Sequence, residues 1–233
     1  MSEDIEALAR RRNITKEQVL AKLKENYDGY HFTRFSPDIF NPYSLLNCFA
    51  ENKFGSYWFT SGTPTYLINM MRKYQVVPTD VITRVEADAS EFDAPTENMP
   101  TIMPLLYQSG YITIKEYHED YNYYVLDVPN KEVKMGLTKA LIPSYVTQNT
   151  LATTNTARRI AQALDKQNME EALTLLQTFL GTVPYCNNAH YEGHYQQMLF
   201  IIFSLLTDYQ VDVEVHTPNG RVDIVLLTHT DLF

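Results

Sequence analysis

One carboxylate stands out by its setting, because Asp223 interrupts a run of apolar residues. Val222 precedes it and residues 224–227 are Ile-Val-Leu-Leu, a composition typical of a buried or half-buried β-strand. A lone carboxylate in an apolar interior is costly, which favours a functional residue such as a metal ligand. A solvent-facing or edge position of the strand is the alternative, and the sequence leaves both open.

Two histidines four residues apart, His190 and His194, flank Glu192 near the start of an expected helix. Histidines at this spacing share one helix face and can bind zinc together. The order His-x-Glu-x-His, however, turns the glutamate toward a different face, and no third ligand is close in the sequence. Surface or helix-capping histidines are the favoured interpretation.

Aromatic side chains crowd the segment between residues 27 and 43. A stacking platform for nucleic-acid bases is one possible use, but packing between helices is more common and is the interpretation favoured here. Asp28-Gly29 has the composition of a tight turn. The aromatic residues are Tyr27, Tyr30, Phe32, Phe35, Phe40 and Tyr43.

Composition and charge narrow the class of protein. The 233 residues carry a net charge of −9, which disfavours broad attraction to nucleic acid or an anionic membrane. Cys48 and Cys186 stand far apart and predict neither a disulfide framework nor a cysteine-rich zinc site. The longest apolar run, residues 198–206, is shorter than the roughly 20 residues of a membrane span. We expect a soluble, cytoplasmic protein that does not enter the membrane.

The first part of the chain predicts helices. Thr15 and Gln18 form a capping box, and Asn41-Pro42 and Thr63-Pro64 each place a capping residue before a proline. These helix starts predict a small bundle over residues 1–84. Residues 85–100 are acidic, contain two prolines and lack periodicity, so we expect a linker there.

Residues 101–147 predict a short helix, a β-hairpin and a second helix, an order that resembles a winged-helix module. The hairpin strands are expected over 111–117 and 121–128, and Asn130 is expected to cap the following helix. The would-be recognition helix, 101–107, has no basic residue, and the hairpin carries Glu116, Glu119 and Asp120 against Lys115. DNA readers need Arg or Lys, so a packing or protein-contact role is favoured.

Residues 148–156 are rich in Thr and Asn and are expected to be a second linker. Helices beginning near Asn168 and Tyr191 follow, and then two strands joined by Pro218-Asn219-Gly220. The predicted fold class is therefore α+β and mainly helical, with residues 157–233 ending in a hairpin. A hairpin alone is marginal, so its open edge predicts self-association as one possible partner contact.

Six short blocks, in order, resemble bacterial proteins that pair an AAA-ATPase-like domain with a C-terminal PD-(D/E)XK nuclease-superfamily domain. No single block is specific, but together they cover most of the chain. The blocks are Tyr27-Asp28-Gly29-Tyr30-His31-Phe32, Asn41-Pro42-Tyr43-Ser44-Leu45, Tyr57-Trp58 with Gly62-Thr63-Pro64, Gln108-Ser109-Gly110-Tyr111-Ile112-Thr113, Pro129-Asn130-Lys131-Glu132-Val133 and Gly220-Arg221-Val222-Asp223.

The resemblance implies an ATPase-lid-like segment over residues 1–84 and the first part of a PD-(D/E)XK-like fold over 157–233. It also implies that Asp223 is a Mg²⁺ ligand, with Glu192 and Glu214 as weaker candidates. The sequence lacks the GxxxxGK[ST] phosphate loop of an ATPase, so no nucleotide-binding residue is assigned. No Glu-x-Lys follows Asp223 either.

These departures predict a fragment without catalytic activity of its own, which serves as a scaffold or interaction module. Its partner would be another protein or its own missing domains, and nucleic acid is implied by the resemblance alone. Two alternatives stay open: a Mg²⁺-dependent phosphodiesterase completed by another subunit, and a protein-binding adaptor that uses exposed aromatic side chains.

Overall fold

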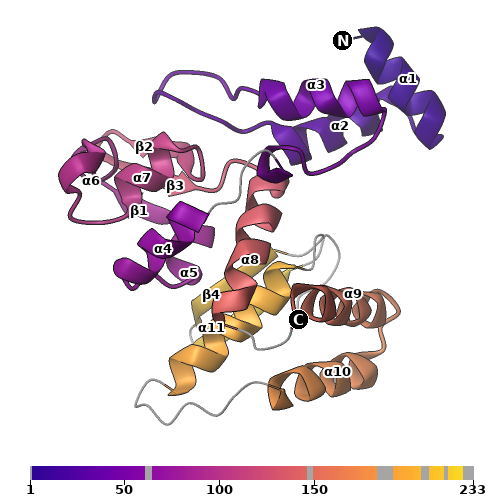
Figure 1. The fold of residues 1–233 in the computed structure, drawn as a ribbon, viewed down its shortest axis with the longest axis vertical. Coiled ribbons are helices and arrows are strands. Elements are labelled where there is room, and N and C mark those ends of the chain that lie inside the picture. The colour runs from indigo at the N-terminus through magenta and orange to yellow at the C-terminus, as the bar shows by residue number, and fades with distance from the viewer. Residues whose placement is uncertain are drawn as a thin grey trace. The chain divides into compact units, whose positions relative to one another are not determined.

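The computed structural model describes residues 2–60, 65–145, 149–182, 191–205, 210–217 and 220–227. The chain divides into two compact units, Met1–Val76 with Asp80–Leu137, and Val77–Thr79 with Thr138–Phe233. Helices predominate, and the described strands form two small antiparallel sheets (Figure 1). This confirms the expected mixed, mainly helical fold class at the coarse level.

The first unit begins with helices α1 (Ser2–Arg12), α2 (Lys16–Tyr27) and α3 (Pro42–Glu51). The predicted caps are present: Gln18 N donates to Thr15 Oγ1 at 3.2 Å, and Ser44 N donates to Asn41 Oδ1 at 3.2 Å. The three helices enclose one apolar core. Its buried residues are Leu8, Ala9, Val19, Leu23, Tyr27, Cys48 and Tyr57.

The hydroxyl group of Tyr27 is hydrogen-bonded inside this core. Its side chain is fully buried, and its hydroxyl donates to Gly55 O at 2.8 Å and accepts from Gly55 N at 2.9 Å. Burial raises the pKa of the Tyr27 phenol well above its usual value. The residue therefore acts as a neutral clamp between α2 and the loop after α3.

The rest of the first unit surrounds a three-stranded sheet in the order β1-β3-β2. Both strand pairs are antiparallel, with Glu86 opposite Val125 and Ile114 opposite Leu126. The elements are η1 (Trp58–Thr60), α4 (Thr65–Lys73), α5 (Thr79–Ile82), β1 (Val85–Ala87), α6 (Ala89–Phe92), η2 (Thr96–Asn98), α7 (Met103–Gln108), β2 (Thr113–His118), β3 (Tyr123–Asp127) and α8 (Lys131–Tyr145), of which α5 and α8 span the boundary between the units.

Three short elements, β1, α6 and η2, lie in the segment 85–100, so that segment has regular structure where a linker was expected. Val85–Ala87 pairs with β3, and Asp88 with Glu91 forms a capping box for α6. A three-residue strand is too short for alternation to be visible in the sequence, and pairing with a distant strand creates it. The winged-helix interpretation of 101–147 stays a prediction, and its sheet takes a strand from outside those bounds.

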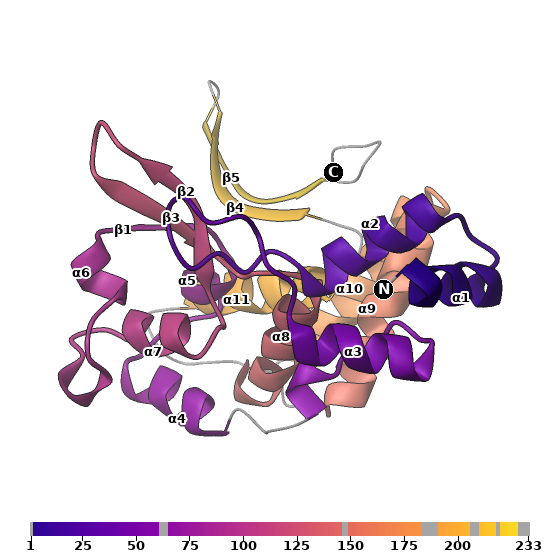
Figure 2. The same cartoon turned by 90° about the horizontal axis from the view of Figure 1, so that it is seen from above.

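The second unit contains helices α9 (Thr150–Asp165), α10 (Met169–Gly181) and α11 (Tyr191–Ser204) and strands β4 (Gln210–Thr217) and β5 (Gly220–Leu227). Helix α9 packs against α10, and the two strands form a curved hairpin (Figure 2). Residues 77–79 join this unit because Gln197 of α11 binds Thr79 twice, at Thr79 N (3.1 Å) and at Thr79 Oγ1 (2.8 Å).

Helix α9 begins at Thr150, so residues 150–156 are helical rather than a linker. The threonine hydroxyls explain the difference, since they bond within the helix: Thr154 Oγ1 donates to Thr150 O at 2.8 Å and Thr156 Oγ1 to Ala152 O at 3.1 Å. Side chains that favour loops on propensity are thus satisfied inside a helix. Burial of Thr153 provides the packing that stabilises it.

Gly136 of α8 yields an unusual prediction. Glycine to alanine in a helix normally stabilises a protein by up to about 1 kcal/mol, but a Cβ at Gly136 would overlap the ring of Phe59. We expect Gly136→Ala to lower the free energy of unfolding by about 1–2 kcal/mol, because overpacking outweighs the helix gain. Urea unfolding measures this, and a variant more stable than wild type would contradict it.

Candidate functional site

The β4–β5 hairpin buries part of its apolar surface. Val211 and Leu226 are opposite each other in the register, and both are buried. Helix α11, whose residues Met198 and Phe200–Ile202 are fully buried, contacts both strands. Helix α11 therefore packs against the hairpin, while the alternation predicted for β4 stays a prediction, because the side chains of residues 212–217 lie outside the described ones.

The side chain of Asp223 is exposed. Because consecutive residues of a strand point to opposite faces of the sheet, Asp223 lies on the face opposite to that of Val222, Ile224 and the buried Leu226. An exposed carboxylate carries little desolvation cost, so burial does not argue for a function here. A metal-binding role therefore has to rest on neighbouring donors and on relatives.

The backbone shows where the other candidate metal ligands lie. Val213↔Ile224 and Val215↔Val222 bracket Glu214 and Asp223 at the same level of the two strands. Glu192 and His194 lie in the first turns of α11. The side chains of Glu192, His194 and Glu214, and His190 as a whole, fall outside the described residues.

Opposed residues of an antiparallel pair occupy the same face of the sheet, which gives this hairpin a place for two carboxylates, Asp223 and Glu214. Carboxylate oxygens are the ligands that Mg²⁺ prefers. Where side chains are described, no group of three or more His, Cys, Asp or Glu residues forms a metal cluster. The hairpin therefore offers donor chemistry that fits a divalent cation.

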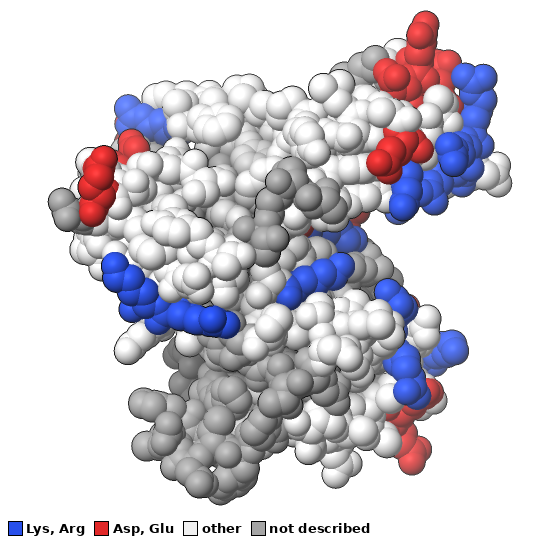
Figure 3. Space-filling view, in the orientation of Figure 1, with Lys and Arg blue, Asp and Glu red and all other residues white. Residues whose placement is uncertain are grey.

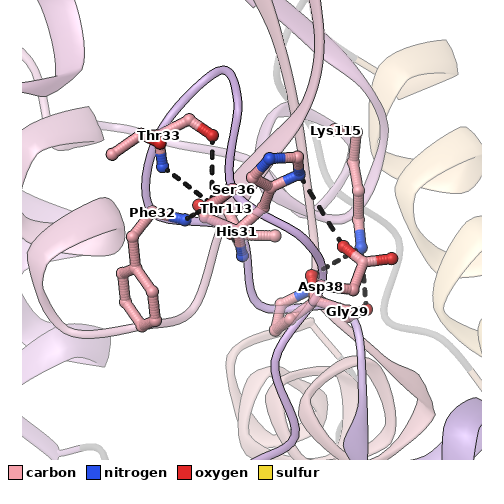
Figure 4. Close-up of polar contacts among 9 residues, drawn as sticks. Gly29, His31, Phe32, Thr33, Ser36, Asp38, Thr113 and Lys115 are labelled. Atoms are coloured by element: carbon pink, nitrogen blue, oxygen red, sulfur yellow. Dashed lines mark hydrogen bonds and ion pairs between the residues drawn. The ribbon is translucent and has the colours of Figure 1, made fainter.

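A second polar cluster, in the first unit, anchors the loop between α2 and α3 (Figure 4). His31 N donates to Thr113 Oγ1 at 2.8 Å, and Thr113 Oγ1 donates to His31 O at 2.9 Å. Lys115 Nζ donates to Gly29 O at 2.9 Å and to Pro129 O at 3.0 Å. The side chains of β2 thus hold the backbone of Gly29 and His31.

Burial, the largest influence, lowers the pKa of Lys115 despite the opposing charges of Asp38, Asp127 and Asp28. The sequence analysis counted Lys115 only as the one base of an acidic hairpin and did not predict this role. That isolation among acidic residues was the one indirect signal for it.

Glu132 was also missed as a site residue. It is 4% exposed, and its Oε1 accepts from Trp58 N at 2.8 Å and from Tyr57 N. Asn130 caps the start of the same helix: its Oδ1 accepts a hydrogen bond from Val133 N at 3.1 Å, and its Nδ2 donates one to Asp28 O at 3.0 Å. Four of the resemblance blocks thus meet through these bonds, while Gly62-Thr63-Pro64 lies outside the described residues.

This cluster does not form a catalytic triad, although Ser36, His31 and Asp38 share one loop. His31 Nδ1 and Asp38 Oδ1 are 3.7 Å apart, whereas Ser36 Oγ accepts from Phe32 N at 3.3 Å and donates to Thr33 O at 3.1 Å. The serine is therefore held by its own turn rather than by the histidine. The chemistry of the cluster is backbone anchoring.

The aromatic segment divides between the core and the surface, so the expectation of core packing was wrong for part of it. Tyr27 and Tyr30 are buried, and burial raises the pKa of Tyr30 to about 12. Phe32, Phe35 and Tyr43 are instead 61%, 81% and 48% exposed.

The segment that contains the β4–β5 hairpin matches a known protein family. The model of the PD-(D/E)XK nuclease superfamily matches residues 190–232. These residues are therefore similar to the PD-(D/E)XK nuclease superfamily. The segment contains all three acidic candidates, Glu192, Glu214 and Asp223, together with α11, β4 and β5.

One curated relative is similar over most of the chain. An uncharacterized protein of Azotobacter chroococcum mcd 1, described by its position in the vnfD 5' region, is 30% identical over 208 residues, which cover 86% of this chain and 39% of that protein. The chain thus spans about two fifths of the length of this relative. No solved structure matches. None of the described helices is both long and apolar enough to cross a membrane.

Proposed function

We propose that residues 190–232 contribute Asp223 as a divalent-metal ligand to a PD-(D/E)XK-type phosphodiesterase site. The observation that supports this is the placement of Asp223 and Glu214 at one level of the hairpin inside the nuclease-superfamily segment. A bound Mg²⁺ would activate a water molecule and neutralise the charge that develops on the phosphate. Asp223, with Glu214 and Glu192 as weaker candidates, would hold it.

By itself the chain serves, in this proposal, as a scaffold rather than a working nuclease. Residues 224–233 contain no Glu-x-Lys, and a Mg²⁺ site that activates water needs further donors at octahedral positions. The AAA-ATPase association belongs to the same proposal and rests on the short motifs of the first unit. No phosphate loop is present in the sequence, so nucleotide hydrolysis would be a property of longer relatives.

Metal titration tests the role of Asp223. We expect isothermal calorimetry of the chain with Mn²⁺ to show weak binding, with Kd on the order of 1 mM, and Asp223→Asn to abolish the heat. The matched control, Asp165→Asn in the exposed last turn of α9, removes an equal charge and leaves binding intact. Equal heats from wild type and Asp223→Asn would remove the proposed site.

A phosphodiesterase completed by a second subunit is the alternative for the same residues. The described part of the second unit forms a two-stranded sheet, with an outer edge on each strand available for pairing. Mn²⁺-dependent cleavage of DNA by the isolated chain, lost in Asp223→Asn and dependent on protein concentration, would favour this alternative over the scaffold.

We also place the protein in the cytoplasm, since Cys48 is a buried free thiol.

A further inference from the structure

The negative charge of this protein is concentrated in one part of the first unit. Residues 80–127 carry ten acidic side chains against two basic ones, in a chain whose net charge is −9. On the face drawn in Figure 3, acidic side chains lie over α6, whereas both signs gather over α1. The two cations are already engaged: Arg84 pairs with Glu116 at 2.9 Å, and Lys115 binds two carbonyl groups.

Three aromatic rings of this acidic region lie near the turn that joins β2 to β3. His118 and Tyr123 are opposite each other in the register, and their rings stack at 4.5 Å with an interplanar angle of 16°. Tyr121, 79% exposed at the turn, lies 6.5 Å from Tyr123. We call these three rings, with Glu86 and Glu116, the wing face.

The carboxylates of the wing face lie close to its rings. Glu116 Oε2 is 3.7 Å from His118 Nε2. Partial burial, followed by the negative charges of Glu86 and Glu116, raises the pKa of Tyr123, as expected for a phenol beside two acids. The exposed ring of Tyr121 and the half-buried rings of Tyr123 and His118 therefore lie beside exposed carboxylates.

The opposite face of the same hairpin already binds a cation through a ring. The Arg34 guanidinium carbon lies 5.0 Å from the Tyr117 ring centroid and 4.6 Å from that of Phe35, which is within the range of a cation–π contact. A guanidinium stacks well on aromatic rings because it is planar and weakly hydrated. The wing face offers similar rings with more negative charge, and no arginine in the described part of the chain stacks on them.

We propose that the wing face is a docking surface for an arginine-rich segment of a protein partner. Tyrosine rings provide contact area at low entropic cost, and the exposed carboxylate of Glu86 complements the guanidinium charges, whereas Glu116 already pairs with Arg84. A polyanion such as nucleic acid is disfavoured, since Glu86 and Glu116 lie beside the rings and residues 80–127 carry ten acidic side chains against two basic ones. This inference is independent of the metal site at Asp223, which lies in the other unit.

Fluorescence anisotropy with a labelled hexa-arginine peptide tests the proposal on the whole chain. We expect binding at 50 mM salt that weakens at 300 mM because the attraction is screened, and weaker binding of hexa-lysine. Tyr121→Ser and Tyr123→Ser should each reduce affinity about two- to fivefold, and Glu86→Lys should reduce it as well. Exposed matched controls, Tyr66→Ser in α4 and Glu170→Lys in α10, should bind as wild type does.

Three outcomes would overturn the proposal. The first is unchanged affinity in both tyrosine variants, which would reduce the binding to general charge attraction. A second is a single-stranded oligothymidine that binds and depends on the same tyrosines. The third is self-association of wild-type chain, seen by light scattering and lost in Tyr121→Ser, which would assign the surface to a second copy. Unaltered Trp58 emission in each variant verifies that the first unit is folded.

Discussion

Glu132→Ala is expected to lower the free energy of unfolding of the first unit by about 2–4 kcal/mol. The Glu132 carboxylate is buried and accepts the N–H groups of Tyr57 and Trp58. Alanine removes that acceptor from both donors, and each buried donor left without it costs about 1–3 kcal/mol. Because Trp58 is the single tryptophan of the chain, its fluorescence during urea unfolding reports on this site directly.

Two control variants separate the acceptor from the charge. Glu132→Gln keeps an oxygen in place and should stay within about 1 kcal/mol of wild type. Glu25→Ala breaks the exposed pair with Lys131, where the two atoms are 2.7 Å apart, and should cost less than about 1 kcal/mol. If Glu132→Ala unfolded at the same urea concentration as wild type, the two hydrogen bonds could not be important for stability.

Gly29→Ala is expected to destabilise the first unit by about 3 kcal/mol or more. Gly29 has φ +93°, a conformation that costs an L-residue about 1–2 kcal/mol, and its Cβ would overlap Pro129 O and approach Lys115 Nζ to 2.9 Å. The added methyl group would push apart the carbonyl groups that Lys115 holds together. Thermal unfolding followed by circular dichroism measures the loss.

The matched control for this substitution is Gly181→Ala at the end of α10. A Cβ there meets no atom within 4 Å, so the substitution should be neutral or stabilise by up to about 1 kcal/mol. Equal melting temperatures for the two variants would mean that the backbone of Gly29 relaxes freely, contrary to the anchoring described for Lys115.

Local signals in the sequence were reliable where one turn of chain contains the whole interaction. The capping box of Thr15 and Gln18 and the Asn41-Pro42 helix start are present as predicted. The expected hairpin of β4 and β5 is also present, with Val211 opposite Leu226. In each cap, and at the turn of the hairpin, the interacting groups lie within a few residues of one another, so composition and spacing contain the information.

Elements that depend on distant partners were missed. Strand β1 forms through its pairing with β3, which lies nearly forty residues later in the chain. Helix α9 contains threonines that favour loops by propensity, yet burial of Thr153 and Ala157 stabilises the helix. Tertiary contacts override weak local preferences in both segments.

The sequence by itself determined the helical character of the chain, its capping residues and the strand that carries Asp223. Only the tertiary structure decided that Asp223 is exposed on β5 while Glu132 is buried. The physical reason is that the solvation of a charge depends on which groups surround it. Those groups, the backbone N–H of Tyr57 and Trp58 for Glu132, come from parts of the chain more than seventy residues away.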